Sequence, residues 1–195
     1  MNDDTRRQQD RFGEAVTSWW SALSRDRGEL NRLRRAGDIT AIQMNEAFFD
    51  LVREFSGEGN DGSGWYHGLI RGSPDTEKGK ERDRAMDVLA CVAMVASHIE
   101  TDSDQSAATL MGRKDGASDH RVSELRFRRL MDSDMEGMAR MMVRILPMID
   151  GCASVADAAR TVYWWDHPSQ TARKRWIGDY YLSNTKQRFS SNEEE

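Results

Sequence analysis

The sequence has little cysteine, little proline and no long apolar run. Its 195 residues include two cysteines and three prolines. Neither Cys91 nor Cys152 belongs to a Cys-x-x-Cys pair, so we expect two buried, reduced thiols and neither a disulfide framework nor a zinc site. The longest apolar stretch, residues 88–99, is too short to cross a bilayer. Since no apolar segment follows the charged first residues, we also expect no secretory signal, no membrane contact and a cytoplasmic location.

Motifs of common enzymes are also missing. No G-x-S-x-G, H-E-x-x-H or G-K-[ST] sequence occurs, and the glycine-rich stretch 57–64 lacks the lysine of a phosphate-binding loop. Asp102 and Asp104 lie in a polar stretch that is typical of a solvated loop. We predict no catalytic residue, no metal site and no cofactor. The histidines show no metal-ligand spacing; they are His67, His98, His120 and His167.

Helix formers dominate the composition, and apolar residues recur at helical spacing. Val16, Trp19, Trp20 and Leu23 fall at i, i+3, i+4 and i+7, and residues 48–55 repeat this pattern. We therefore predict an all-α fold of two packed helical halves, residues 12–104 and 118–182, joined by a polar loop. Residues 1–11 and 183–195 are predicted to be disordered tails because they carry little apolar surface.

Further helices are expected along the chain. The most apolar segment, residues 85–99, predicts the central helix of the N-terminal half, and residues 101–119 are predicted to form the polar connection between the halves. Ser118 and Asp119 offer N-cap chemistry for a helix that begins near His120. A methionine-rich helix is predicted from about Asp134 to near Pro147, which should kink or end it. Segments 154–165 and 171–182 complete the predicted helices.

The net charge of −5 argues against a free-standing nucleic-acid binder, but the arginines are clustered. Residues 113–129 hold six basic side chains against three acidic ones, and Arg140 and Arg144 are one helical turn apart. Guanidinium groups suit phosphate oxygens because their donors form a planar fork. The same pattern also fits ordinary solvated helix faces whose arginines pair with Asp or Glu at i±4, so this alternative stays open.

Three aromatic pairs occur at helical positions: Trp19–Trp20, Trp164–Trp165 and Tyr180–Tyr181. Such rings can stack on bases. In a chain of this size they more often anchor a core or a subunit interface, and we predict that at least one member of each pair is buried.

The order of these features resembles the CasB family, the small subunit of the type I-E CRISPR Cascade complex. The resemblance covers most of residues 12–182, and its most specific stretch is VSELRFRRLM at 122–131. It also includes LNRLRR at 30–35, LMGR at 110–113, MARMMVRIL at 138–146 and the closing aromatic segment 163–181. The glycine-rich stretch 56–64 and the acidic tail depart from the family pattern.

The resemblance implies a subunit without an active site that contacts nucleic-acid backbone. The implied partners are the backbone and large subunits of Cascade, a second copy of the chain, guide RNA and the displaced single-stranded DNA. The residues implied to bind nucleic acid are Arg34, Arg35, Arg113, Arg121, Arg126, Arg128, Arg140, Arg144, Arg173 and Lys174.

Three other functions compete with this interpretation. The first is a helical protein–protein adaptor whose arginine faces meet acidic partners and bind no nucleic acid. A helix-turn-helix regulator would prefer one duplex sequence, and a nuclease would need convergent carboxylates to hold a divalent metal.

Overall fold

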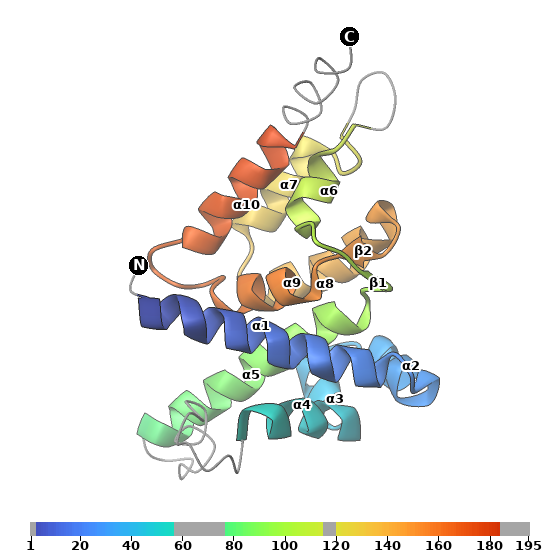
Figure 1. Ribbon diagram of the computed structural model, residues 1–195, viewed down its shortest axis with the longest axis vertical. Coiled ribbons are helices and arrows are strands. Elements are labelled where there is room, and N and C mark those ends of the chain that lie inside the picture. The colour runs from blue at the N-terminus through green and yellow to red at the C-terminus, as the bar shows by residue number, and fades with distance from the viewer. Residues whose placement is uncertain (1–2, 57–76, 115–119, 184–195) are drawn as a thin grey trace.

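The structure is a computed structural model that describes residues 3–56, 77–114 and 120–183 (Figure 1). These residues form ten α-helices and one pair of two-residue strands, which confirms the predicted all-α fold. The elements are α1 (Asp3–Leu23), α2 (Arg27–Arg35), α3 (Ile39–Gln43), α4 (Glu46–Ser56), α5 (Glu77–Ser97), β1 (Thr101–Asp102), α6 (Ala107–Gly112), α7 (Glu124–Asp132), α8 (Met135–Ile145), the 3-10 helix η1 (Leu146–Ile149), β2 (Cys152–Ala153), α9 (Val155–Tyr163) and α10 (Thr171–Leu182).

Helix α5 lies at the centre of the molecule and contacts helices from both ends of the chain, whereas its composition predicts a central helix of the N-terminal half. Every side chain from Val88 to Ser97 is buried, because α2, α3, α4, α8 and α9 surround this part of the helix. Helix α1 packs along α9, so contacts run between early and late parts of the chain (Figure 1). The buried residues form one continuous core that includes both parts. The division into two helical halves at residues 105–117 stays a prediction.

The connection between these parts is more ordered than the sequence predicts. Strand β1 pairs in parallel with β2, and α6 follows where a polar loop was expected. This prediction was wrong for residues 107–112 because Leu110, Met111 and their alanine neighbours bury their side chains against the core. Helix α6 packs closely on α10: a Cβ at Gly112 would lie 2.1 Å from the carbonyl oxygen of Tyr180. Glycine is therefore the residue that this contact accommodates.

Several helix boundaries match their sequence signals and one does not. Asp134 caps α8, accepting a hydrogen bond from the backbone N–H of Gly137 at 2.7 Å. Helix α8 ends just before Pro147 and continues as η1, and α10 has the predicted bounds. Helix α7, in contrast, begins at Glu124 rather than near His120, with Ser123 at its N-cap.

Some of the predicted tails and loops lie partly or wholly outside the described ranges. Helix α1 begins at Asp3, so it includes most of the segment 1–11 that was expected to be a tail. Residues 1–2, the glycine-rich stretch 57–64, Ser118–Asp119 and residues 184–195 lie outside the described residues.

One member of each aromatic pair is buried, as predicted. Trp19, Trp165 and Tyr180 are almost fully inaccessible, and each donates a hydrogen bond to a backbone carbonyl. The acceptor for the Tyr180 hydroxyl is Val122, at 2.7 Å. These polar tips are therefore satisfied inside the core, which is where Trp and Tyr are stable when buried.

The two cysteines are free thiols in different environments. Cys91 is buried on α5, and desolvation there raises the pKa of its thiol to about 12, with a further contribution from the charge of Glu136. Cys152 is only half-buried, so the prediction of two buried thiols was wrong for this residue. It lies on β2, at the edge of the small sheet. Among the helices described, none is long and apolar enough to span a membrane.

Candidate nucleic-acid interface

Five exposed arginines lie on the consecutive helices α7 and α8, and we call them the outward arginines: Arg126, Arg128, Arg129, Arg140 and Arg144. Helix α7 buries Phe127 and Leu130, and α8 buries Met138, Met142 and Ile145. Because a helix turns about 100° per residue, the arginines between these apolar positions project toward solvent.

Helix α7 is held firmly in place by aromatic packing. The ring of Phe127 stacks on that of Tyr180 from α10, with a centroid distance of 3.9 Å and an angle of 7° between the rings. The backbone that carries the outward arginines of α7 is therefore fixed against α10. A fixed backbone is what a site needs to hold a charged ligand at a defined distance.

The outward arginines differ in their partners. Arg128 pairs with Glu124, and Arg140 pairs with Glu136, both at i+4. For Arg128 and Arg140, these pairs match the alternative interpretation of the sequence, in which arginines on solvated helix faces pair with acidic side chains of their own helix. Arg126 instead contacts the sulfur of Met148 on η1, at 3.1 Å. The side chains of Arg129 and Arg144 form no hydrogen bond or ion pair with any part of the chain that the structure describes.

The acidic partner on α7 is itself held by a tyrosine. The hydroxyl of Tyr181 donates a hydrogen bond to Glu124 at 2.9 Å. This bond, followed by the charge of Arg128, lowers the pKa of the Glu124 carboxyl. Glu124 is therefore ionised at neutral pH and remains a competitor for any anion that approaches Arg128.

Three of the predicted residues are half-buried and bind other parts of the fold, and we call them the inward arginines: Arg34, Arg121 and Arg173. Arg173 donates to the carbonyl oxygens of Trp165 (3.1 Å), Met131 (2.6 Å) and Ser133 (2.9 Å). Its guanidinium also lies over the Trp165 ring, 4.8 Å from the centroid. Most of the Arg173 donors are thereby used to connect the end of α7 to the end of α9.

Arg34 and Arg121 have similar structural roles. The Nε of Arg34 donates to the carbonyl oxygen of Ser97 at 2.7 Å, which satisfies an otherwise unpaired acceptor at the end of α5. Arg121 forms an ion pair with Asp150, 2.8 Å long, just after η1. Both side chains connect segments that are distant in sequence.

The remaining predicted residues do not join the outward arginines. Arg35 is exposed on α2 and donates to the carbonyl of Asn31 in its own helix. Helix α2 lies apart from α7, beside the end of α1 in the lower half of the view (Figure 1). Lys174 is exposed on α10 and donates to Ser169, and Arg113 lines a separate groove. Among the predicted residues in the described ranges, Arg126, Arg128, Arg140 and Arg144 are the ones that share two consecutive helices packed on each other, α7 and α8.

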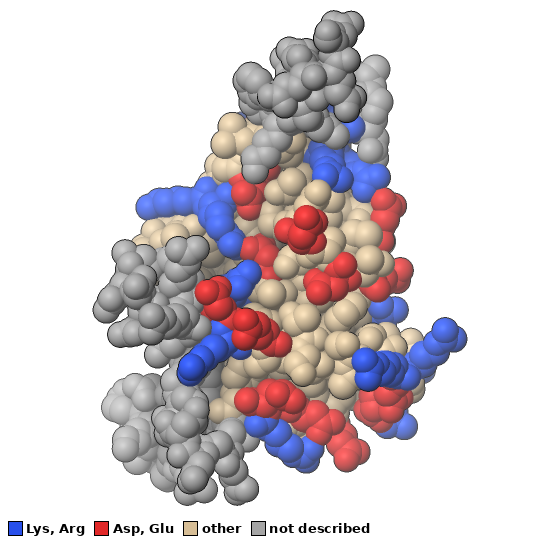
Figure 2. Space-filling model, viewed as in Figure 1, with Lys and Arg blue, Asp and Glu red and all other residues tan. Residues whose placement is uncertain are grey.

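Charge on the visible surface is mixed. Figure 2 shows Lys and Arg side chains interspersed with Asp and Glu on one face of the molecule, around a larger uncharged area. Among the residues coloured in this view, the basic side chains form no continuous surface. The described residues of this face therefore offer no basic patch for a polyanion.

A family model described as CRISPR-associated protein Cse2 matches residues 29–181 of the chain. This chain belongs to the Cse2 family. Cse2 is the small subunit of type I-E Cascade, also called CasB, which confirms the resemblance found in the sequence. Members of the Cse2 family are structural subunits that work with the other subunits of Cascade, and they are not known enzymes. No curated protein and no solved structure matches the chain.

The Cse2 match starts within α2 and ends within α10, so it contains all ten predicted residues and all the outward arginines. Arg129 was missing from the prediction, although its position three residues after Arg126 places it on the same side of α7. Helix α1 lies outside the match.

The described residues show no arrangement that would hold a metal ion. No group of three or more His, Cys, Asp or Glu side chains converges in these parts of the chain. His98, at the end of α5, places its Nδ1 2.8 Å from the carbonyl oxygen of Met94. Burial is the main cause that lowers the pKa of its imidazole, and the charge of Arg34 acts in the same direction. The imidazole is therefore neutral at pH 7 and bound within the fold.

Proposed function

We propose that this chain is a non-catalytic subunit of a type I-E CRISPR surveillance complex that holds nucleic-acid phosphates with its outward arginines. The observation that carries the proposal is the placement of five exposed arginines on two packed, consecutive helices of a Cse2-family protein. Such a complex works in the cytoplasm with its backbone and large subunits, a second copy of this chain, guide RNA and single-stranded DNA.

Phosphate contacts suit the task of such a subunit. A guide–target hybrid or a displaced strand can have any sequence, so a site that holds it should contact the backbone and leave the bases unread. Arginines on rigid helices provide a salt-dependent interaction that tolerates any sequence. Arg126, Arg129 and Arg144 have no acidic partner among the residues described, so they are the strongest candidates.

The net charge of −5 is compatible with this role. A subunit embedded in a ribonucleoprotein needs one local basic surface only. Because the rest of its surface is acidic or mixed, the free chain gains little non-specific affinity for other nucleic acids.

A second candidate is a protein–protein adaptor without nucleic-acid binding. Leu125 lies among the arginines of α7 and is 62% exposed, and Tyr181 on the neighbouring α10 is 44% exposed. Exposed apolar side chains beside paired charges are also found at protein interfaces. In this function, the outward arginines would contact acidic side chains of a partner.

The test is native mass spectrometry of the tagged chain purified from its source organism, with sequencing of any RNA that copurifies. We expect a large ribonucleoprotein that holds repeat-flanked guide RNAs and more than one copy of the chain. A nucleic-acid-free monomer or a small protein-only complex would contradict the proposal and favour the adaptor.

A further inference from the structure

The aromatic pair Tyr180–Tyr181 brings an exposed ring to the outward arginines. Tyr180 is buried, whereas Tyr181 is 44% exposed on α10. The hydroxyl of Tyr181 and the guanidinium of Arg128 contact the same carboxylate oxygen of Glu124. The ring of Tyr181 therefore lies close to one cation of the proposed nucleic-acid interface.

The Tyr181 ring is held in a fixed orientation. It lies nearly perpendicular to the rings of Tyr180 and Phe127, at angles of 87° and 89° and centroid distances of 5.1 Å and 6.4 Å. Its hydroxyl donates to Glu124 at 2.9 Å, so the polar tip of the side chain already has a partner. A ring that is held in this way loses little conformational entropy when a flat ligand stacks on it.

Exposed apolar side chains gather on the two helices that carry this ring and the neighbouring arginines. Seven large hydrophobic side chains are exposed among the residues described, and four of them lie on α7 and α10: Leu125, Ile177, Tyr181 and Leu182. Ile177 precedes Tyr181 by four residues, so both lie on one side of α10. On α7, Leu125 lies between Arg128 and Arg129, which follow it by three and four residues. Single exposed apolar residues are common on protein surfaces, but a group of them indicates a binding site.

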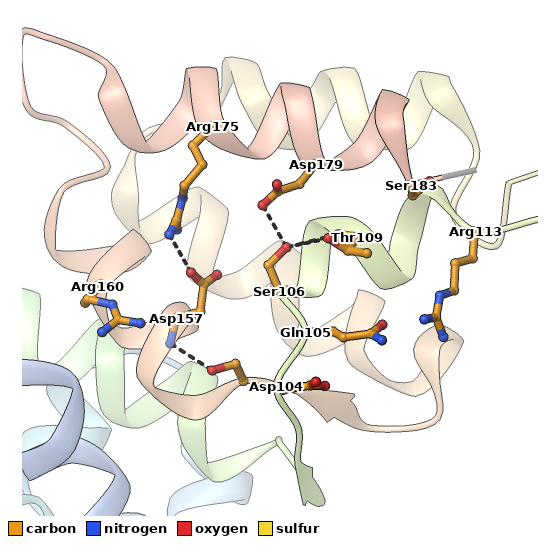
Figure 3. Close-up of a pocket in the computed structure, with 11 residues that line it drawn as sticks. Asp104, Gln105, Ser106, Thr109, Arg113, Asp157, Arg160, Arg175, Asp179 and Ser183 are labelled. Carbon is orange, nitrogen blue, oxygen red and sulfur yellow. Dashed lines mark hydrogen bonds and ion pairs between the residues drawn. The ribbon is translucent and has the colours of Figure 1, made fainter. Parts of the chain in front are cut away.

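The opposite side of α10 has a different composition. Arg175 and Asp179 extend from it into a polar groove between α6, α9 and α10 (Figure 3). There Arg175 pairs with Asp157, and Asp179 accepts a hydrogen bond from Ser106 at 2.8 Å. These charges have partners within the fold. Helix α10 thus uses one side for internal ion pairs and hydrogen bonds, and it exposes apolar surface on the side that carries Tyr181.

A nucleic-acid strand matches both the cations and the apolar surface. Its phosphates suit Arg128 and Arg129, and its bases suit a tyrosine ring with apolar neighbours. Glu124 disfavours a phosphate beside the ring, whereas its carboxylate can accept a hydrogen bond from the amino group of a base. Because bases in a duplex are already stacked on one another, an unpaired nucleotide is the form that fits this surface.

We propose that Tyr181 stacks on a base of the single strand whose phosphates bind the outward arginines. This inference rests on the function proposed above and adds a contact to the base that phosphate binding does not include. Every base has a π-face, so such stacking tolerates any sequence. Leu125 and Ile177 enlarge the apolar surface that is available to neighbouring bases, and the interface includes α10 as well as α7 and α8.

Two labelled oligonucleotides of equal length test this inference with the full chain. One is oligothymidylate, and the other has the same number of phosphates on abasic sugars, so the two strands differ in their bases alone. Fluorescence anisotropy measures both affinities at one salt concentration. The variants are Tyr181→Ala, Tyr181→Leu and Tyr181→Phe. The matched control is Phe49→Ala, which removes a ring of equal exposure, 44%, from α4. Circular dichroism checks the fold of each variant.

The wild-type chain should bind oligothymidylate roughly five- to tenfold more tightly than the abasic strand, the scale of one stacked base. Tyr181→Ala should remove most of this preference and leave the affinity for the abasic strand within about twofold of the wild type, since the phosphate contacts remain. Tyr181→Leu should also lose the preference, and it replaces Tyr181→Ala if that variant does not fold. Tyr181→Phe and Phe49→Ala should keep the preference.

Equal wild-type affinities for the two strands would overturn the base contact and leave the phosphate contact of the proposed function intact. A preference that survives in Tyr181→Ala and Tyr181→Leu would also overturn it. So would an equal loss of affinity for both strands, because Tyr181 would then only position α7. If the wild-type chain bound neither strand, the proposed function would fail as well, and the exposed apolar side chains would belong to a protein interface.

Discussion

Arg144 and Arg173 are the same residue type in two regions of the molecule, and they have different roles. Arg173 reaches across the fold to three backbone carbonyls and the face of Trp165. The Arg144 side chain extends from the last turn of α8 and meets no partner among the described residues. The difference lies in what each helix faces. Arg173 lies beside two chain segments that expose carbonyl groups, and Arg144 lies opposite the buried methionines of its own helix.

Basic residues in this chain therefore cannot be treated as one nucleic-acid surface. Inward arginines stabilise the fold by satisfying acceptors that would otherwise be left unpaired. Outward arginines contribute little to stability because exposed charges are well solvated. Mutations in the two sets should accordingly affect different measurements.

The largest expected effect is on nucleic-acid affinity when three outward arginines lose their charge. The combination of Arg126→Gln, Arg129→Gln and Arg144→Gln should weaken binding of single-stranded DNA roughly 100-fold at about 0.1 M salt, given about 0.7 released counterions per phosphate contact. The melting temperature should change little. Fluorescence anisotropy with a labelled oligonucleotide measures the affinity.

A matched control removes the same charge elsewhere. Arg11, Arg53 and Arg84 are exposed on α1, α4 and α5, and changing all three to Gln should weaken binding far less. Equal losses in the two triple variants would show that overall charge, rather than the α7–α8 surface, determines the affinity.

The next effect is on stability. Arg173→Ala should lower the free energy of unfolding by about 2 kcal/mol, because it leaves partly buried carbonyls without donors. In a chain of this size the melting temperature should fall by roughly 4–8 °C. Arg173→Lys should recover part of the loss, since an ammonium keeps the charge without the planar fork. Circular dichroism would detect both, and a melting temperature unchanged by Arg173→Ala would contradict the inward role.

A smaller effect is the pH dependence of stability that His98 contributes, next to the inward Arg34. Because burial lowers the pKa of His98 below its usual 6.5, the unfolded chain binds a proton there more readily than the folded chain. Stability from this group is complete above the unfolded pKa and falls as the pH drops through 6.5 toward the folded pKa. The loss is about 1.4 kcal/mol for each pH unit that separates the two pKa values. His98→Gln should flatten the fall in urea-unfolding free energy between pH 7 and 5. A slope equal to that of the wild type would exclude His98 as its source.

The smallest expected effect is a gain of affinity. Glu136 pairs with Arg140 on the exposed side of α8, so Glu136→Gln should release that guanidinium and strengthen DNA binding roughly twofold, the scale of an exposed i,i+4 pair. Glu46→Gln, on α4, removes the same charge far from the outward arginines and should have no such effect. If Glu136→Gln weakened binding, Arg140 would not take part in the contact.

The sequence predicts the helices well where apolar spacing and caps agree, as in α8 after Asp134 and in α10. It does not predict α6, because six residues within a polar stretch give too short a pattern to separate a helix from a loop. The candidate site is predictable only in part. Arg144 and Arg173 look alike in sequence, since two of the three carbonyl groups that distinguish Arg173 come from residues about 40 positions away. The groove has the same origin: Arg113, Asp157 and Asp179 are brought together by tertiary packing alone.

The most direct test of the two arginine classes is the salt dependence of single-stranded DNA binding by the full chain, compared between the wild type and the Arg126, Arg129 and Arg144 to Gln variant. We expect the slope of log affinity against log salt to become shallower by about 2 in the variant, which corresponds to the loss of three phosphate contacts. Arg173→Ala, measured below its melting temperature, should keep the wild-type slope. Equal slopes for the wild type and the triple variant would contradict the assignment of the outward arginines to nucleic acid.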